Sequence, residues 1–226
     1  MINQRRSFMN VKKIRDIFNT SEINLGIEAE ELAQLARMYQ TYESAQQEIA
    51  TKLENLDAEF QLNYNHNPIH HLEGRMKDPQ SLMGKLQRKG LPLDINVIPN
   101  EIFDIAGIRV ITNYIDDIYT VERLLVAQDD VKLLKRKDYV KDPKPSGYRS
   151  LHLVVEIPVF MSTGVKHMPV EIQVRTIGMD MWASLEHKLR YKTDSERAEE
   201  FADNLIGYAN ELNQIEQNFQ NIHREL

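Results

Sequence analysis

Two helical stretches with apolar residues at alternating spacings of three and four flank a β-branched middle region. The first apolar seam consists of Leu32, Leu35, Tyr39, Tyr42, Ile49, Leu53, Leu56 and Phe60. Only Gln46 interrupts it, and a similar seam repeats over residues 201–226. Such spacing predicts long helices with one apolar side. The two seams either face an ordinary core or pair with each other, within one subunit or between subunits.

The region between the seams predicts an α+β fold. Runs of β-branched and apolar residues predict strands at 106–112, 131–135, 151–157 and 168–174, the last two joined through Pro158 and Gly164. Helices are expected at 7–19, 67–89, 99–105, 116–127, 177–191 and from 194 onward. We therefore expect a mixed sheet of about five strands with long N- and C-terminal helices. The chain 1–226 is expected to be a single domain, with helices at 1–64, a core at 65–192 and a final helix at 193–226.

Composition and charge narrow the class of protein. There is no cysteine, so disulfides and zinc–thiolate sites are excluded. No stretch approaches the roughly 20 apolar residues of a membrane span, and a cytoplasmic protein is expected. The net charge is −6, yet residues 132–149 carry seven bases and two acids. This local excess of positive charge favours a small polyanion over duplex DNA as the ligand.

The cationic segment 137–152 has the composition of a binding site for a phosphate and a base. Prolines and Gly147 predict a stiff turn, and Tyr148 offers a flat face on which a ring can stack. Upstream, residues 67–89 are expected to form one helix on which Ser81 and Lys85 share a face. The cations of this helix either bind a phosphate chain or form a solvated basic face. The glycine-rich fingerprints of common nucleotide sites are absent.

Two carboxylates flank predicted strands. Asp104 precedes the strand at 106–112, and Gly107 removes a side chain where a ligand or backbone approaches closely. Strand alternation places Glu171, Gln173 and Arg175 on one face. Asp104 and Glu171 together suit a divalent metal and the acceptance of a hydroxyl proton. The alternatives are a turn aspartate satisfied locally and a strand that faces solvent.

Four linked motifs resemble the synthetase domain of the RelA/SpoT family. They are Arg75-Met-Lys77 with Ser81 and Lys85; Asp104-Ile-Ala-Gly-Ile-Arg109; Lys137-Asp-Tyr with 143–152; and Glu171-Ile-Gln-Val-Arg-Thr176 with 182–187. Their order and spacing match over about 65–192, and the chain resembles a small alarmone synthetase, closest to the RelP branch.

The resemblance implies transfer of the β,γ-pyrophosphate of ATP to the 3′-hydroxyl of GDP or GTP, with release of AMP, by a nucleotidyltransferase-like sheet. It implies that Arg75 and Arg109 sandwich adenine. The ATP phosphates would be held by Lys77, Ser81 and Lys85. Mg²⁺ would bind Asp104, and Glu171 would help to bind it or would take the proton. The guanine nucleotide would be bound by Tyr148, stacked on the base, by Lys137, Lys144 and His152 on phosphates, and by Gln173 and His187 as supporting contacts.

The relatives suggest a homotetramer built through the terminal helices. One departure is Ser146, where the family commonly has Asn, so any contact made by the longer amide is in doubt. A competing interpretation is a non-catalytic binder of nucleotides or single-stranded RNA that uses Tyr148 and the lysines. The two acids argue against it, because a groove that only binds polyanions does not favour carboxylates.

Overall fold

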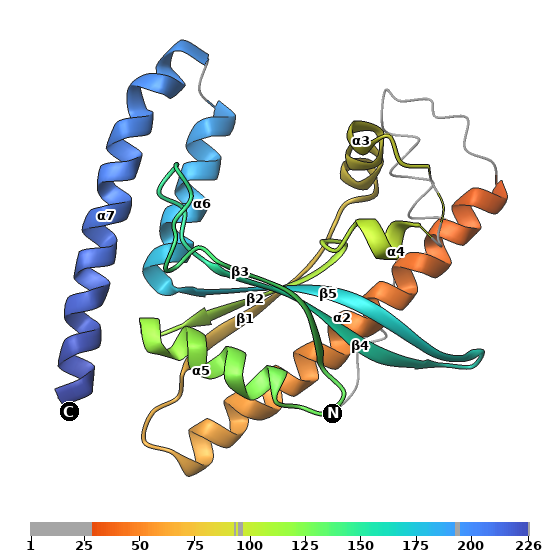
Figure 1. Cartoon of the computed structure of the whole chain (residues 1–226), viewed down its shortest axis with the longest axis horizontal. Helices are drawn as coiled ribbons and strands as arrows, with labels where there is room; N and C mark the ends of the chain where they lie inside the picture. The colour runs from red at the N-terminus through yellow and green to blue at the C-terminus, as the bar shows by residue number, and fades with distance from the viewer. Residues whose placement is uncertain (1–28, 93, 95–96, 193–194, 226) are drawn as a thin grey trace.

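The computed structural model describes residues 29–92, 94, 97–192 and 195–225, which form a curved sheet with helices packed around it (Figure 1). The expected helix at 7–19 and the cap at residue 194 lie outside the described residues. The elements are α2 (Ala29–Asn63), β1 (Ile69–Met76), α3 (Pro79–Lys89), α4 (Ile98–Glu101), β2 (Ala106–Thr112), α5 (Ile115–Val126), β3 (Lys132–Asp138), β4 (Leu151–Met161), β5 (Gly164–Thr176), α6 (Ile177–Lys192) and α7 (Ser195–Glu225). Among them, no helix is long and apolar enough to cross a bilayer.

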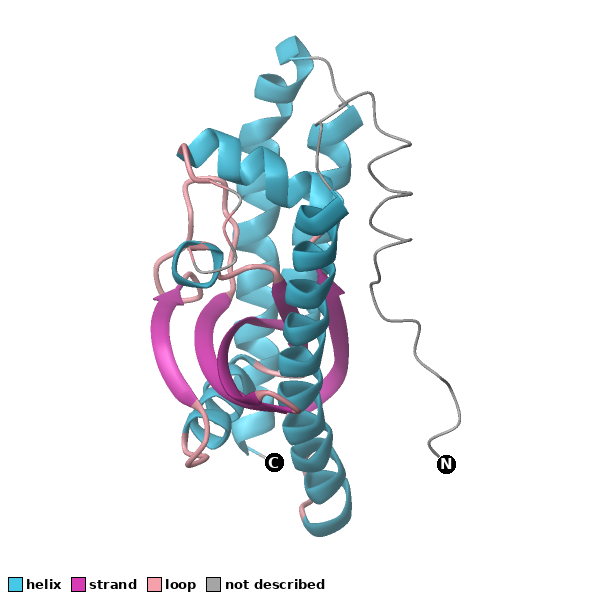
Figure 2. Cartoon of the chain, turned by 90° about the vertical axis from the view of Figure 1, so that its right-hand side faces the viewer, coloured by secondary structure: helices cyan, strands magenta, loops and turns pink. Residues whose placement is uncertain are grey.

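The five strands form one mixed sheet in the order β1-β2-β5-β4-β3. Strands β2 and β5 are parallel, and the other three pairs are antiparallel. Figure 2 shows how strongly the sheet curves. The predicted α+β class with a mixed five-stranded sheet is therefore confirmed. The parallel pairing of β2 with β5, which are far apart in the sequence, decides which side chains meet at the site.

The single helix expected over 67–89 is wrong. Asn67 and Pro68 lead into strand β1, and the Asn67 side chain accepts a hydrogen bond from the Ile69 amide at 2.9 Å. The helix begins only at Pro79, where the Asp78 side chain accepts from the Ser81 amide. Strand β1 pairs only with β2, and most of its side chains are exposed, so it lacks the apolar alternation that marks a strand.

The expected junction between β4 and β5 at Pro158 is also wrong. Strand β4 runs through Pro158 to Met161 and turns directly into β5 at Gly164. The neighbouring strand β3 pairs with β4 only as far as Glu156. Pro158 therefore lies where β4 has become an edge, and there a residue without an N–H is tolerated.

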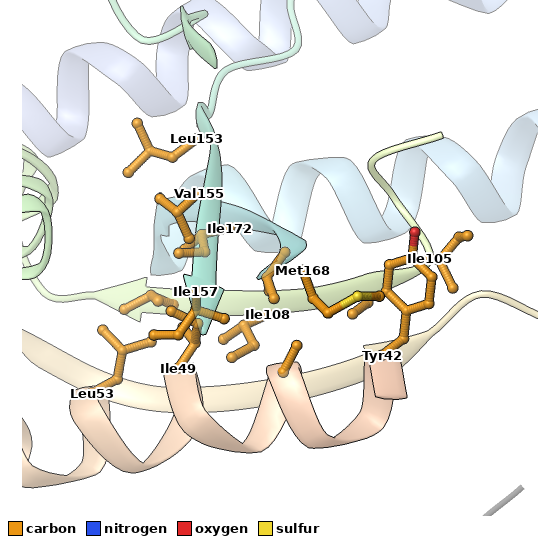
Figure 3. Packing of buried hydrophobic residues seen from close by; sticks show 14 of the residues in the cluster. Tyr42, Ile49, Leu53, Ile105, Ile108, Leu153, Val155, Ile157, Met168 and Ile172 are labelled. Atoms are coloured by element: carbon orange, nitrogen blue, oxygen red, sulfur yellow. The ribbon is translucent and has the colours of Figure 1, made fainter. Parts of the chain in front are cut away.

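Helix α2 uses its apolar seam to cover one face of the sheet. Tyr42, Ile49 and Leu53 are fully buried and point toward Ile108 and other strand residues (Figure 3). The seam of α2 thus faces the core of its own subunit and does not pair with α7 there. Helix α7 packs against α6 and α5 instead (Figure 1).

Gln46, the interruption in the α2 seam, has a partner inside the sheet. Its Nε2 donates to the carbonyl of Gly107 at 2.7 Å. A buried carbonyl without a donor costs free energy, so one polar residue on an apolar helix face is favourable here. This contact ties α2 to the strand that carries the candidate site.

Candidate active site

Strand register collects the polar side chains on the sheet face opposite α2. Residues paired across a sheet point to the same side, as do residues two apart along a strand. One row joins Arg75, Gly107 and Glu171, and the next joins Arg109, Gln173, His152 and Lys137. The intervening residues Ile108, Ile172 and Leu153 are buried on the other side. Alternation on each strand gives the faces, but the register between strands creates the site.

Asp104 lies between α4 and β2, below two lysines. Its Oδ2 accepts from Lys77 Nζ at 3.1 Å and from Lys85 Nζ at 2.8 Å. Burial alone would raise the pKa of this carboxyl, but the hydrogen bonds and charges of Lys85 and Lys77 outweigh it and hold the pKa below its ordinary value. Its other oxygen, Oδ1, is buried and has no hydrogen-bond partner among the residues that the structure describes. An ionised carboxylate with one unpartnered oxygen is suited to a hard cation.

The helix expected at 99–105 is too long, since α4 stops at Glu101 and Asp104 lies beyond its end. The two lysines, rather than a helix dipole, set its charge environment.

Glu171 on β5 is held at both oxygens. Its Oε2 accepts from Gln173 Nε2 at 3.0 Å, and its Oε1 lies 3.5 Å from His152 Nδ1. Burial by itself would raise the pKa of Glu171, and nearby Asp104 acts in the same direction. The hydrogen bonds from His152 and Gln173 prevail, so the pKa lies below its ordinary value. Two ionised carboxylates therefore stand near each other on one face of the sheet.

Two hollows meet at these carboxylates. The first, of about 280 Å³, is lined by Arg75, Lys77, Asp104, Gly107, Ile108, Arg109, Glu171 and Gln173. The second, of about 400 Å³, is lined by Lys85, Lys89, Glu101, Phe103, Asp104, Lys135, Lys137, Tyr139, Lys144, His152, Val154 and Glu171. Asp104 and Glu171 are the residues common to both linings. Cation-rich hollows joined at a carboxylate pair are suited to a transfer between two phosphate-bearing ligands.

The structure brings together most of the predicted site residues. Arg75, Lys77, Arg109 and Gln173 line the first hollow, whereas Lys85, Lys137, Lys144 and His152 line the second. Three predicted residues line neither of them. Ser81 is exposed on α3, His187 is exposed on α6, and Tyr148 is partly buried against the cluster formed by Trp182, Ala183 and Ala209.

Sequence reasoning missed several residues of the second hollow. The rings of Tyr139 and His152 lie nearly perpendicular, with centroids 5.3 Å apart, and Lys144 Nζ lies 4.7 Å from the centre of the Tyr139 ring. Lys135 Nζ lies 3.9 Å from the ring centre of Phe103. Lys135, Lys137 and Tyr139 follow one another at spacings of two, so alternation from Lys137 was the signal that would have found them. Lys89 and Glu101 become neighbours of the site only through the fold.

Comparison with known proteins gives the family. Residues 74–196 match the sequence model described as "Region found in RelA / SpoT proteins". The chain is 40% identical over 185 residues to GTP pyrophosphokinase YwaC of Bacillus subtilis, covering 82% of this chain and 88% of that protein. It is 39% identical over 160 residues to GTP pyrophosphokinase YjbM of the same organism, covering 70% and 74%. The protein belongs to the RelA/SpoT family.

Solved structures agree with this assignment. The small alarmone synthetase 1 of Bacillus subtilis bound to its product pppGpp superposes with a TM-score of 0.77 at 34% identity, over 85% of this chain and 98% of that one. The small alarmone synthetase 2 of Bacillus subtilis gives a TM-score of 0.72 at 38% identity, over 82% and 95%. The predicted resemblance to small alarmone synthetases is confirmed, and the closer placement in the RelP branch stays a prediction.

Proposed function

We propose that this protein is a GTP pyrophosphokinase that transfers the β,γ-pyrophosphate of ATP to the 3′-hydroxyl of GDP or GTP, yielding AMP and the alarmone ppGpp or pppGpp of the stringent response. The observation that carries the proposal is the pair of hollows joined at Asp104 and Glu171. Similarity to named GTP pyrophosphokinases along most of their length supports it. Two substrates need two binding places, and the reacting atoms must meet where those places join.

The first hollow is assigned to ATP. Its two arginines, Arg75 and Arg109, stand on adjacent strands, and planar guanidinium groups stack well on a base. Arg109 Nη1 lies 3.4 Å from Glu73 Oε2, an exposed contact that adenine binding would replace. Lys77 and Lys85 are assigned to the phosphates, with Ser81 at the exposed edge of α3. Both lysines already converge on Asp104, so they direct positive charge to the junction of the hollows.

The second hollow is assigned to the guanine nucleotide. Lys137, Lys144 and His152 are assigned to its phosphates. Gln173, which lines the first hollow, and His187, which lines neither, are assigned to supporting contacts from the family resemblance alone. The sequence motifs favour Tyr148 as the stacking partner of guanine, but Tyr139 is the tyrosine that lines the hollow. The ring centres of Tyr139 and Tyr148 are 6.2 Å apart. The variants Tyr139→Ala and Tyr148→Ala separate the two assignments, because only loss of the stacking ring should raise the KM for GDP strongly while leaving the KM for ATP unchanged.

The donor set fits Mg²⁺ as the metal. Mg²⁺ is commonly held by one or two carboxylates together with substrate phosphates. Asp104 Oδ1 is a buried carboxylate oxygen without a donor in the described part of the chain. Asp104 and Glu171 would hold the ion. When bound, it supplies neutralisation of the charge on the phosphate chain.

The remaining chemistry falls to side chains of this protein. Glu171 is ionised and half-buried at the junction, so its carboxylate is available to take the proton from the ribose hydroxyl. Lys77 and Lys85 stabilise the charge that develops as AMP leaves. The walls of the two hollows hold donor and acceptor in line, which removes much of the entropic part of the barrier.

The test is incubation of the purified protein with ATP, GDP or GTP, and Mg²⁺, followed by chromatographic detection of AMP and a guanosine 3′-pyrophosphate. Glu171→Gln should lower kcat by about 10²- to 10⁴-fold, the range expected for loss of a general base. Asp104→Asn should abolish turnover with the fold intact. Asp130→Asn is the matched control, because within the described ranges its carboxylate pairs with Lys52 alone, at the surface. Absence of both products across metal and nucleotide conditions would overturn the proposal.

We also propose that the chain forms a homotetramer through its terminal helices. Helix α7 exposes Phe201, Tyr208, Ile215, Phe219 and Ile222, all more than a third accessible. So many exposed large apolar residues on one helix are typical of an interface. Light scattering of the wild type and of a Phe219→Glu/Ile222→Glu variant tests this, since the variant should be smaller. A monomeric wild type would refute it.

A cytoplasmic location stays a prediction of the cysteine-free sequence.

A further inference from the structure

Arg175 is a buried cation on the site face of β5 that the proposed mechanism does not use. Its side chain is only 5% exposed, and it follows Glu171 and Gln173 on the same side of the strand. Nη1 donates to Asp180 Oδ1 on α6 at 3.0 Å, which balances the buried charge. The other terminal nitrogen, Nη2, donates to two acceptors: the Tyr148 hydroxyl at 2.7 Å and Gln173 Oε1 at 2.6 Å.

The bond to Tyr148 influences which atoms donate and which accept along a series of hydrogen bonds that ends at Glu171. A guanidinium only donates, so the oxygen of Tyr148 accepts from Arg175 and its own proton remains free to be donated. That hydroxyl lies 2.8 Å from His152 Nε2. When the Tyr148 hydroxyl donates this proton to His152 Nε2, the ring proton remains on Nδ1, and Nδ1 is the nitrogen that lies 3.5 Å from Glu171 Oε1. The acceptor-only carboxylate at the other end favours the same tautomer, but at 3.5 Å its influence is weaker than that of the hydroxyl at 2.8 Å.

The bond to Gln173 fixes the orientation of an amide that donates to the other oxygen of Glu171. Because Gln173 Oε1 accepts from Arg175, the amide cannot turn over without placing its NH₂ group against the guanidinium. Gln173 Nε2 therefore faces Glu171 Oε2 and donates to it at 3.0 Å. Both oxygens of Glu171 thus face donors whose direction is set by a single side chain.

We infer that Arg175 is a positioning residue for the proposed transfer: it sets the Nδ1–H tautomer of His152 and the amide orientation of Gln173, and so holds Glu171 ready at the junction of the two hollows. The inference rests on the proposed function for its kinetic consequence, but its structural content does not. Without Arg175, the Tyr148 hydroxyl and the Gln173 amide are each free to reverse, and either reversal turns a donor away from Glu171.

The direct test is the tautomer of His152. In ¹³C,¹⁵N-histidine-labelled full-length protein, solid-state correlation spectra at a pH where the ring is neutral report which nitrogen carries the proton, and the His152→Gln spectrum assigns the signal. We expect Nδ1–H in the wild type and a shift toward Nε2–H in Arg175→Met and in Tyr148→Phe. Tyr148→Phe keeps the ring and the Arg175–Asp180 pair, so it decides the question if Arg175→Met does not fold. An Nε2–H wild type, or an unchanged tautomer in Tyr148→Phe, would overturn the inference.

The kinetic test separates positioning from a structural role. Arg175→Met is expected to lower kcat about 10- to 100-fold, the usual cost of removing a partner that orients a site residue, with little change in the KM for ATP. A variant that is merely destabilised would contain fewer active molecules, and each of them would keep the wild-type kcat. Titration of active sites with a tight-binding nucleotide measures the active fraction and so separates the two cases. If the wild type makes no product at all, the proposed function fails while the tautomer measurement still decides the inference.

Discussion

Gly147 is the position where one added methyl group should reveal how the cationic loop is held. Its φ of +89° lies in the left-handed region that favours glycine. A Cβ there would lie 2.8 Å from Ala209 Cβ and 3.4 Å from Ile206 Cα on α7, and 3.6 Å from Trp182 on α6. The closest atoms belong to a backbone and a single methyl group, which cannot rotate aside. Gly147→Ala must therefore push the loop away from α7.

Two costs add in this variant. The left-handed conformation costs an alanine about 1–2 kcal/mol, and overpacking of a closely packed contact costs about 1–3 kcal/mol. The expected loss in free energy of unfolding is therefore about 2–5 kcal/mol. Gly90→Ala is the matched control, because Gly90 also has positive φ, +64°, but has nothing within 4 Å of the added Cβ. It should lose only the first part, about 1–2 kcal/mol.

Urea unfolding of both variants, followed by the fluorescence of Trp182, measures the difference. The neighbouring Tyr148 should move with the loop, so Gly147→Ala should also raise the KM for GDP more than that for ATP. Equal losses of stability in Gly147→Ala and Gly90→Ala would show that the loop does not pack on α7 as described, and would refute the reasoning.

Three further predictions address the first hollow, the core and a buried acid. Gly107→Ala should fold normally, since its Cβ would be 3.5 Å from the nearest protein atom, yet raise the KM for ATP about tenfold by filling the hollow; an unchanged KM would remove ATP from this place. Leu53→Ala should lose about 2–5 kcal/mol in urea unfolding, whereas Leu62→Ala, 83% exposed, should change by less than about 0.5 kcal/mol. Burial raises the pKa of Glu216, and hydrogen bonds from Thr176 and Gly178 oppose this only in part. Folding thus favours the protonated form of Glu216. Its contribution to the free energy of unfolding is present below the pKa of the unfolded state and is lost as pH rises through the pKa of the folded state. Glu216→Gln should gain stability relative to the wild type across that interval, and a pH-independent difference would contradict the assignment.

Much of the fold was readable because it rests on local chemistry. The apolar runs around Ile108, Val155 and Ile172 predict strands wherever their partners lie, and alternation places Glu171 and Gln173 on one face without knowledge of the neighbouring strand. Strand β1 was missed because the prediction uses only such local patterns. Its exposed, polar residues, Arg75 among them, satisfy an edge position that only a neighbouring strand defines.

Other features depend on pairing between distant segments, and local patterns do not encode it. The apolar seam of α2 has the same sequence pattern whether it covers a helix or a sheet. Only the packing of Ile49 against Ile108 and neighbouring strand residues shows that it covers the sheet (Figure 3). Tyr139 and Tyr148 are both aromatic residues of one cationic segment, and the turn around Gly147 decides which of them lines the second hollow.

The amino-acid sequence alone predicted most of the described helices and strands, the carboxylates and cations of the candidate site, and the family resemblance that those motifs carry. Only the tertiary structure decided that β5 inserts between β2 and β4, which sets Glu171 beside Gly107 and His152 beside Gln173. It also decided that Arg175 reaches both Tyr148 and Gln173. The physical reason is that side-chain direction follows from local backbone geometry, whereas strand register and hydrogen-bond direction depend on partners far away in the chain.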